Sequence, residues 1–384
     1  MQQTRRSMMT WAGVTGLVGP GLLGLGACGA KASEVPSPTD PVEAQIEAIR
    51  QEAKAVALGA GVYDRTGLVK SYVRGKRRAN ADDLATLDDR WHIGSNTKAM
   101  TGALWARLVE KGLARWDMPL GEAVQKAGLG FGVNAAWDGV TVEQLMRHRG
   151  GLTDASVIGR QWLMTARDDP RSLKEQRAAI AKAALEAAPA GEVGAYQYGN
   201  ANYIVAGAIM EGLCGTSWEE AMQAEVFGPL GMTRCGFGAP KGDAPWGHRA
   251  MMTVKLPVDP EGKASDNPLA LGPAGTVHVT LEDYGRFIAA ILNGGGDWLS
   301  QDSVRRLTTA VEGETYALGW IVLSPQPWAK GQVIGHEGSN TLWHTFTALD
   351  LDEGKAWVAV SNDAAGGAQA CPLAGVALAK GATV

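Results

Sequence analysis

The chain has 384 residues, of which 45% are hydrophobic and 20% charged, so it can bury a large core in one domain or in two closely joined ones. This composition excludes a disordered or fibrous protein. A formal net charge of −4 gives no long-range attraction to nucleic acid, and the short basic cluster at 74–78 is typical of a solvated turn. We therefore expect no nucleic-acid partner.

Residues 1–32 have the pattern of an export signal. Arg5 and Arg6 supply the positive charge, an apolar stretch follows over 11–25, and small residues come after it. The apolar stretch is too short and too rich in glycine to predict a membrane span. Residues 4–9 also resemble a twin-arginine signal. We therefore expect an exported protein of the periplasm or cell envelope.

Two ways of processing this signal remain open. Residues 25–28 resemble a bacterial lipobox, which would make a lipidated Cys28 the first residue of the mature protein and anchor it to a membrane. The alternative is ordinary cleavage after Ala30 or Ala32. Residues 33–41 are rich in Pro, Ser and Thr and predict a tether, which an anchored domain needs to stand off a membrane.

The remaining cysteines are Cys214, Cys235 and Cys371, if Cys28 is lipidated or removed. An odd number excludes a complete disulfide framework. One bond between Cys214 and Cys235 and a set of buried free thiols both remain open.

A first helix and a strand hairpin are predicted next. Apolar residues at 42, 46, 49 and 53 form one face of a helix. Two strand-like runs, 56–63 and 68–73, then flank the turn at 64–67.

The helix that follows carries a serine and a lysine three residues apart. Apolar residues at helical spacing predict a helix that begins near Ser95 and ends at Gly112. Positions three apart share a helix face, so the Lys98 amine reaches back to the Ser95 hydroxyl. A serine needs such a base to become a nucleophile, and burial lowers the pKa of a lysine. Because a Ser-x-x-Lys pair often occurs by chance, it needs support from other motifs.

Helical patterns dominate from 97 to about 292, and strand patterns return near the end of the chain. The expected late strands are 316–323, 332–336, 342–351 and 357–361, with a closing helix over 368–380. Strand hairpins at both ends predict an α+β fold in a domain over 42–384: an antiparallel sheet built from both chain ends and flanked by helices. A helical subdomain is inserted at about 110–295. The cleft between sheet and insertion is the expected site.

Five motifs in order carry a resemblance to a known family. They are GSNTK at 94–98, LMRHRGGL at 145–152, YGNANY at 198–203, FGPLGM at 227–232 and GHEG at 335–338. Together they resemble the serine β-lactamase and penicillin-binding protein superfamily, most closely the branch of class C β-lactamases, DD-peptidases and family VIII esterases. The resemblance spans nearly the whole mature chain and implies a β-lactamase-like (DD-peptidase) fold.

The resemblance implies three catalytic residues. Ser95 maps onto the nucleophile, Lys98 onto its base, and Tyr198 onto the tyrosine that moves the proton and later activates water. We expect an ammonium beside the phenol to stabilise Tyr198 as a phenolate. Without the other motifs, Tyr198 would be assigned to the core.

Four further residues map onto substrate-binding positions. Asn200 would bond the lysine amine and the substrate amide. The third family motif falls on His336 and Gly338, and the glycine lets a substrate approach the strand backbone closely. The backbone N–H groups of Ser95 and Ser339 would form the oxyanion hole.

Two departures from the family pattern concern charge. His336 replaces a lysine, so it would titrate near neutrality and hold a substrate carboxylate less firmly. Glu337 brings a carboxylate where the family usually has a small residue. Alternation along the strand predicts that it points away from the site, because His336 and Gly338 share the opposite face.

The sequence therefore predicts a serine hydrolase that forms an acyl-enzyme on Ser95 and acts as an esterase, or as a peptidase or amidase on D-amino-acid-type substrates. The alternatives are a class C-like β-lactamase or DD-carboxypeptidase, and a catalytically silent cell-envelope binding protein of the same fold. We expect a monomer that takes a small-molecule or peptide substrate and uses no cofactor. No metal is expected either, since Asn340 stands where an H-E-x-x-H motif starting at His336 needs its second histidine.

Overall fold

A computed structural model describes residues 37–381 except 39 and 253. The predicted export signal, Cys28 and the start of the tether lie outside the described residues. None of the helices within the described part of the chain is long and apolar enough to cross a membrane.

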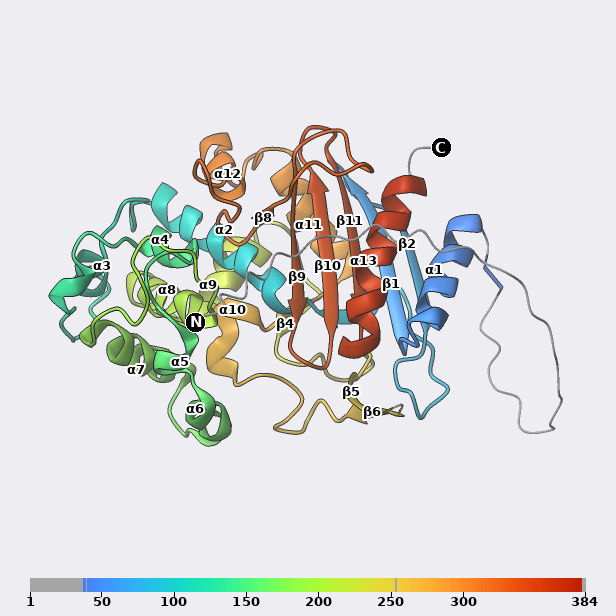
Figure 1. Cartoon of the computed structure of the whole chain (residues 1–384), viewed down its shortest axis with the longest axis horizontal. Helices are drawn as coiled ribbons and strands as arrows, with labels where there is room; N and C mark the ends of the chain where they lie inside the picture. Colours follow the sequence, from blue (N-terminus) through green and yellow to red (C-terminus); the bar gives the residue numbers. More distant parts are fainter. Residues whose placement is uncertain (1–36, 39, 253, 382–384) are drawn as a thin grey trace, which may run out of the picture. The chain divides into compact units, whose positions relative to one another are not determined.

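A six-stranded antiparallel sheet joins the two ends of the chain, as predicted (Figure 1). Its strand order is β2-β1-β11-β10-β9-β8. The early strands are β1 (Ala57–Asp64) and β2 (Gly67–Gly75), and the late ones are β8 (Ile321–Val322), β9 (Val333–Ser339), β10 (His344–Asp350) and β11 (Lys355–Ser361). The chain ends meet where β1 pairs with β11, with Ala60 opposite Ala359.

Helices cover both faces of this sheet. Helices α1 (Pro41–Glu52) and α13 (Ala364–Gly381) pack on one face, where Ile46, Phe346 and Leu378 belong to one buried apolar cluster (Figure 1). Helix α11 (Leu281–Leu292) packs against β1 and β2 from the other face. Successive side chains along a strand point to opposite faces, so the sheet contributes to one apolar core on each face.

The inserted part of the chain is mainly helical. Its longest helices are α2 (Thr97–Glu110), α7 (Leu173–Glu186) and α8 (Asn200–Cys214). The shorter ones are α3 (Leu120–Lys126), α4 (Val142–Met146), α5 (Asp154–Val157), α6 (Arg160–Thr165), α9 (Trp218–Met222) and α10 (Gly272–Gly275), and α12 (Gln301–Thr308) follows α11. Capping boxes at Thr141 and Ser217 begin α4 and α9.

The structure corrects two details and decides one alternative that was left open. The sequence did not predict five short strands, one before the helical region and four within it. β3 (Arg90–His92), which precedes that region, forms one sheet with β4 (Cys235–Phe237) and β7 (Val277–Thr280), and β5 (Gly247–Met251) and β6 (Val254–Val258) form a hairpin. The strand expected over 316–323 is only β8, because Gly319 turns the chain at φ +88°. The three cysteines in the described part of the chain are free thiols, with no Cys214–Cys235 bond.

Candidate active site

Ser95 lies in a tight turn where the sheet edge meets the inserted helices. The turn η1 (Gly94–Asn96) leads directly into α2. Gly94 has φ +52°, and a side chain there would collide with the Ser339 backbone nitrogen on β9. A side chain at Gly338 would collide with the Ile93 carbonyl oxygen and come within 2.8 Å of the Ser95 nitrogen. Two glycines thus let β9 cross the turn at backbone contact.

Lys98 is fully buried, and its amine contacts three oxygens. Its Nζ lies 3.1 Å from Ser95 Oγ, 2.9 Å from Asn200 Oδ1 and 2.7 Å from the Ala274 carbonyl oxygen. The amide and carbonyl oxygens only accept hydrogen bonds. A neutral amine has two hydrogens and one lone pair, so donation to these two oxygens leaves the lone pair for the Ser95 hydroxyl.

The surroundings of Lys98 favour this neutral form. Burial lowers the pKa of Lys98 to about 7, and the Asp154 carboxylate opposes part of that shift. The rings of Tyr198 and Tyr203, whose centroids lie 5.0 and 5.6 Å from Nζ, favour the ammonium form, but burial outweighs them. Much of the lysine is therefore unprotonated near neutral pH, as a general base must be.

Tyr198 faces Ser95 from the segment before α8. Its hydroxyl donates to Ser95 Oγ over 3.0 Å, and the residue remains 41% exposed. Desolvation raises the pKa of Tyr198, and the Ser95 hydrogen bond opposes this only in part. The expectation of a phenolate is therefore wrong. A largely neutral Lys98 supplies no permanent ammonium to stabilise one, so Tyr198 holds its proton.

Asn200, the first residue of α8, connects Lys98 to a carboxylate that sequence analysis missed. Its Oδ1 accepts from Lys98, while its Nδ2 donates to Asp154 Oδ2 over 3.3 Å. The other oxygen of Asp154 accepts from the Ala201 backbone nitrogen at 2.8 Å. Asp154 has a weak signal in the sequence, since it follows the 145–152 motif by two residues. Ala274 has none, because it contributes only a backbone carbonyl.

His336 is buried and uncharged, which corrects the expectation that it titrates near neutrality. Burial, helped by repulsion from Lys98, lowers the pKa of His336 to about 3. Its Nδ1 donates to the Glu337 carbonyl oxygen at 2.5 Å, and its Nε2 accepts from the Tyr316 hydroxyl at 3.2 Å. Both ring nitrogens are thus bonded within the protein. Tyr316 is a further site neighbour that sequence analysis missed.

Glu337 points away from Ser95, as strand alternation predicted. Its Oε2 lies 3.0 Å from Nε2 of His344 on the neighbouring strand β10, two residues before Phe346, which is the register partner of Glu337. Cys371 of α13 lies near this pair on the far face of the sheet. The Glu337 carboxylate therefore adds no negative charge on the side of the serine.

Ser339 ends β9 beside the serine turn. Its hydroxyl donates to the Trp343 carbonyl oxygen at 2.7 Å, and the residue is exposed. Because β9 crosses the turn in backbone contact, the backbone nitrogens of Ser339 and Ser95 belong to two segments that touch each other. The oxyanion-hole role of these two amides stays a prediction.

The ring of His148 packs against the ring of Tyr198. His148 is buried, adopts φ +60°, and its Nδ1 accepts from the Gly199 nitrogen at 3.3 Å. Its ring centroid lies 4.4 Å from that of Tyr198 and 4.7 Å from that of Tyr316. Burial lowers the pKa of His148 well below its ordinary value, so the ring packs as a neutral group.

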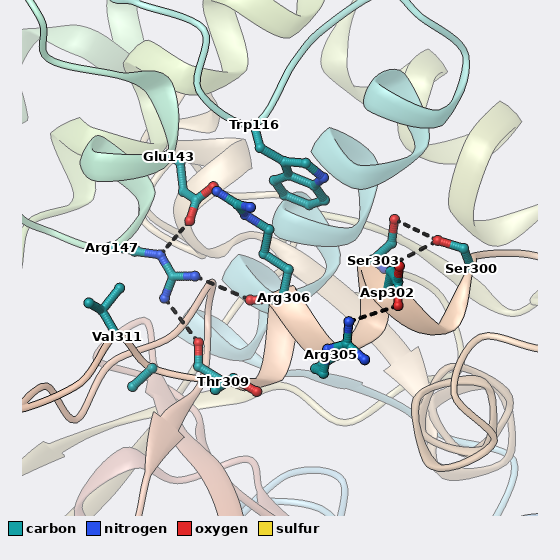
Figure 2. Close-up of a pocket in the computed structure, with 11 residues that line it drawn as sticks. Trp116, Glu143, Arg147, Ser300, Asp302, Ser303, Arg305, Arg306, Thr309 and Val311 are labelled. Atoms are coloured by element: carbon teal, nitrogen blue, oxygen red, sulfur yellow. Dashed lines mark hydrogen bonds and ion pairs between the residues drawn. The ribbon is translucent and has the colours of Figure 1, made fainter.

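A cavity of about 660 Å³ lies behind this segment (Figure 2). Buried Arg147 bonds Glu143 on α4 at 2.7 Å and the carbonyl oxygens of Arg306 and Thr309 at the end of α12. Arg306 also bonds Glu143 and lies over the ring of Trp116. These charges are already paired, so the network fixes the backbone next to His148.

Within the described part of the chain, no cluster of His, Cys, Asp and Glu has the arrangement of a metal site.

A model of the family described as Beta-lactamase matches residues 42–381. An unguisins hydrolase of Aspergillus campestris is 25% identical over 297 residues, which is 72% of this chain and 53% of that protein. The chain spans about half the length of the curated relatives it matches.

Two solved structures share the fold. The octameric penicillin-binding protein homologue from Pyrococcus abyssi is 21% identical, with a TM-score of 0.68 over 84% of this chain and 73% of that one. The D-amino acid amidase from Ochrobactrum anthropi SV3, complexed with L-phenylalanine amide, is 17% identical, with a TM-score of 0.69 over 90% of this chain and 99% of that one. At these identities the likeness extends to the fold alone.

Proposed function

This chain belongs to the β-lactamase family, and from that premise we propose that it is a serine hydrolase working through an acyl-enzyme on Ser95. The observation that carries the proposal is the buried Lys98 amine, 3.1 Å from Ser95 Oγ, with its two other contacts made to pure acceptors. This is the contact that a serine nucleophile requires of its base.

In the proposed acylation, Ser95 Oγ bonds the substrate carbonyl carbon while its proton passes to Lys98. The Ser95 and Ser339 amides would hold the developing oxyanion. Tyr198 then gives its proton to the leaving group and receives the one held by Lys98, so no phenolate accumulates. In deacylation the same groups take a proton from water, and Ser95 regains its hydrogen when the ester breaks.

The proposed substrates are esters and amides of D-amino-acid type without a carboxylate beside the scissile bond. His336 is uncharged and bonded to Tyr316 and to the strand backbone, so it provides no cation for such a carboxylate. D-amino acid amidases among the proteins of similar fold agree with this choice. A class C-like β-lactamase or DD-carboxypeptidase would need to bind a carboxylate in this place.

Matched substrates test the proposal. A D-alanyl anilide and a short nitrophenyl ester are compared with D-alanyl-D-alanine peptides and a chromogenic cephalosporin, with Ser95→Ala as the control. We expect kcat/KM to favour the two substrates that lack a carboxylate at least tenfold, and His336→Lys to narrow that gap. Faster turnover of the carboxylate substrates would contradict the substrate class. Absence of turnover in a folded protein would favour the binding-protein alternative.

A further inference from the structure

Helix α8 begins without a capping side chain of its own. Its N-cap is Gly199, and the first turn of a helix leaves backbone N–H groups unpaired. Asp154 from α5 supplies the missing acceptor, since its Oδ1 receives the Ala201 N–H at 2.8 Å. A side chain at Gly199 would come within 2.9 Å of that oxygen, so glycine keeps the approach open. One carboxylate oxygen thus holds the helix that presents Asn200.

The second oxygen of Asp154 has a different partner. Its Oδ2 accepts from Asn200 Nδ2 at 3.3 Å, while Asn200 Oδ1 accepts from Lys98 at 2.9 Å. An amide has one donating and one accepting end. A carboxylate only accepts, so it holds the donating end and leaves the accepting end for the lysine. The reversed amide would set N–H groups against the amine and an oxygen against the carboxylate.

We propose that Asp154 is a positioning residue for the reaction at Ser95, because its carboxylate fixes which end of the Asn200 amide faces Lys98. This inference rests on the proposed function. With Asn200 held in this sense, the lysine donates to Asn200 and Ala274, and its lone pair remains directed at Ser95. Asp154 itself touches neither Ser95 nor a reacting atom and acts through Asn200.

The other titratable groups around Lys98 are neutral near pH 7, so the effect of the Asp154 charge on the pKa of Lys98 can be measured. The titratable groups that surround Lys98 are Asp154, His148, Tyr198, Tyr203 and His336. Burial lowers the pKa of both histidines and raises the pKa of both tyrosines, so these four groups stay neutral near pH 7. Asp154 is the group among them whose negative charge raises the pKa of Lys98.

The rate at which a fluorophosphonate modifies Ser95 between pH 5 and 9 tests the inference without a natural substrate. Asp154→Asn removes the charge and leaves one acceptor oxygen for two donors, so either the Asn200 amide or the Ala201 N–H loses its partner. We expect the plateau rate to fall about tenfold or more and the acid limb to move down by about one pH unit. Asp117→Asn is the matched control, because that side chain is 80% exposed, and it leaves both quantities unchanged.

The exchange variant Asp154→Asn/Asn200→Asp gives the sharper result. It reverses the hydrogen bond between positions 154 and 200, keeps acceptors for the Ala201 N–H and for Lys98, and puts a carboxylate directly against Lys98. We expect the plateau rate to recover relative to Asp154→Asn and the acid limb to move above that of the wild type. A role in folding alone would lower the melting temperature of Asp154→Asn and leave the plateau rate of its folded fraction unchanged.

The outcomes separate the two proposals. A wild-type protein that is never modified at Ser95 contradicts the proposed function. If the wild type is modified and both folded Asp154→Asn and the exchange variant keep the wild-type acid limb, the role of Asp154 is overturned and the proposed function stands. If Asp154→Asn does not fold, the exchange variant decides, and an unmoved limb or a failure to fold there counts against the inference.

Discussion

Lys98 is the residue whose protonation controls the proposed chemistry. The sequence predicted its place one helical turn after Ser95, because residue type and spacing suffice for that. The charge states of Tyr198 and His336 were not predictable. They follow from desolvation by segments far apart in the chain, such as that of Lys98, which also lowers the pKa of His336.

The pH dependence of acylation tests the protonation of Lys98. Burial lowers the pKa of Lys98 to about 7, so its base form is lost as pH falls through that value. We expect kcat/KM for an uncharged ester to fall tenfold per pH unit below about pH 6 and to level off above about pH 8. Lys98→Arg, which cannot deprotonate, is expected to lose at least a hundredfold. A rate that keeps rising to pH 10 would show that the lysine retains its ordinary pKa.

At the level of elements, the hairpins at the two chain ends were predictable, because period-two patterns and turn residues are local. The strands β3, β4 and β7 were missed because three or four residues are too few to show alternation. They form only because the helical insertion brings them together.

The crossing of β9 over the serine turn makes Gly338 sensitive to an added methyl group. In Gly338→Ala the new Cβ meets the Ile93 carbonyl oxygen and the Ser95 nitrogen, both backbone atoms that cannot swing aside. We expect a loss of about 1–3 kcal/mol in the free energy of unfolding and of most activity. Gly121→Ala on α3 is the control, since nothing lies within 4 Å of its Cβ. Denaturant melts and ester assays that cannot distinguish the two variants would contradict the close crossing.

The ion pairs in Figure 2 connect α4 and α12 beside the His148 segment. Glu143→Ala leaves Arg147 buried without its carboxylate, so we expect unfolding to become easier by about 3 kcal/mol or more. Asp302 lines the same cavity, but its side chain is 82% exposed. We therefore expect Asp302→Asn to leave the free energy of unfolding unchanged within error. Equal melting curves for both variants would mean that the network contributes nothing to stability.

On the scale of the whole molecule, the cysteines report both disulfide state and processing. Cys214, Cys235 and Cys371 are free, and the fate of Cys28 stays a prediction. Unfolded, unreduced mature protein is expected to titrate three thiols if Cys28 is lipidated or removed. One thiol would contradict the structure by revealing a disulfide. Four would contradict the predicted export processing, and the mass of the N-terminal peptide distinguishes a lipidated Cys28 from cleavage after Ala30 or Ala32.

The most direct measurement is the intact mass of the protein after exposure to a fluorophosphonate, followed by peptide mapping. We predict one added phosphonyl group, located on Ser95, and none in the Ser95→Ala variant. A folded protein that gains no mass, or that is modified at another residue, would contradict the claim that Ser95, Lys98 and Tyr198 form a working nucleophilic site.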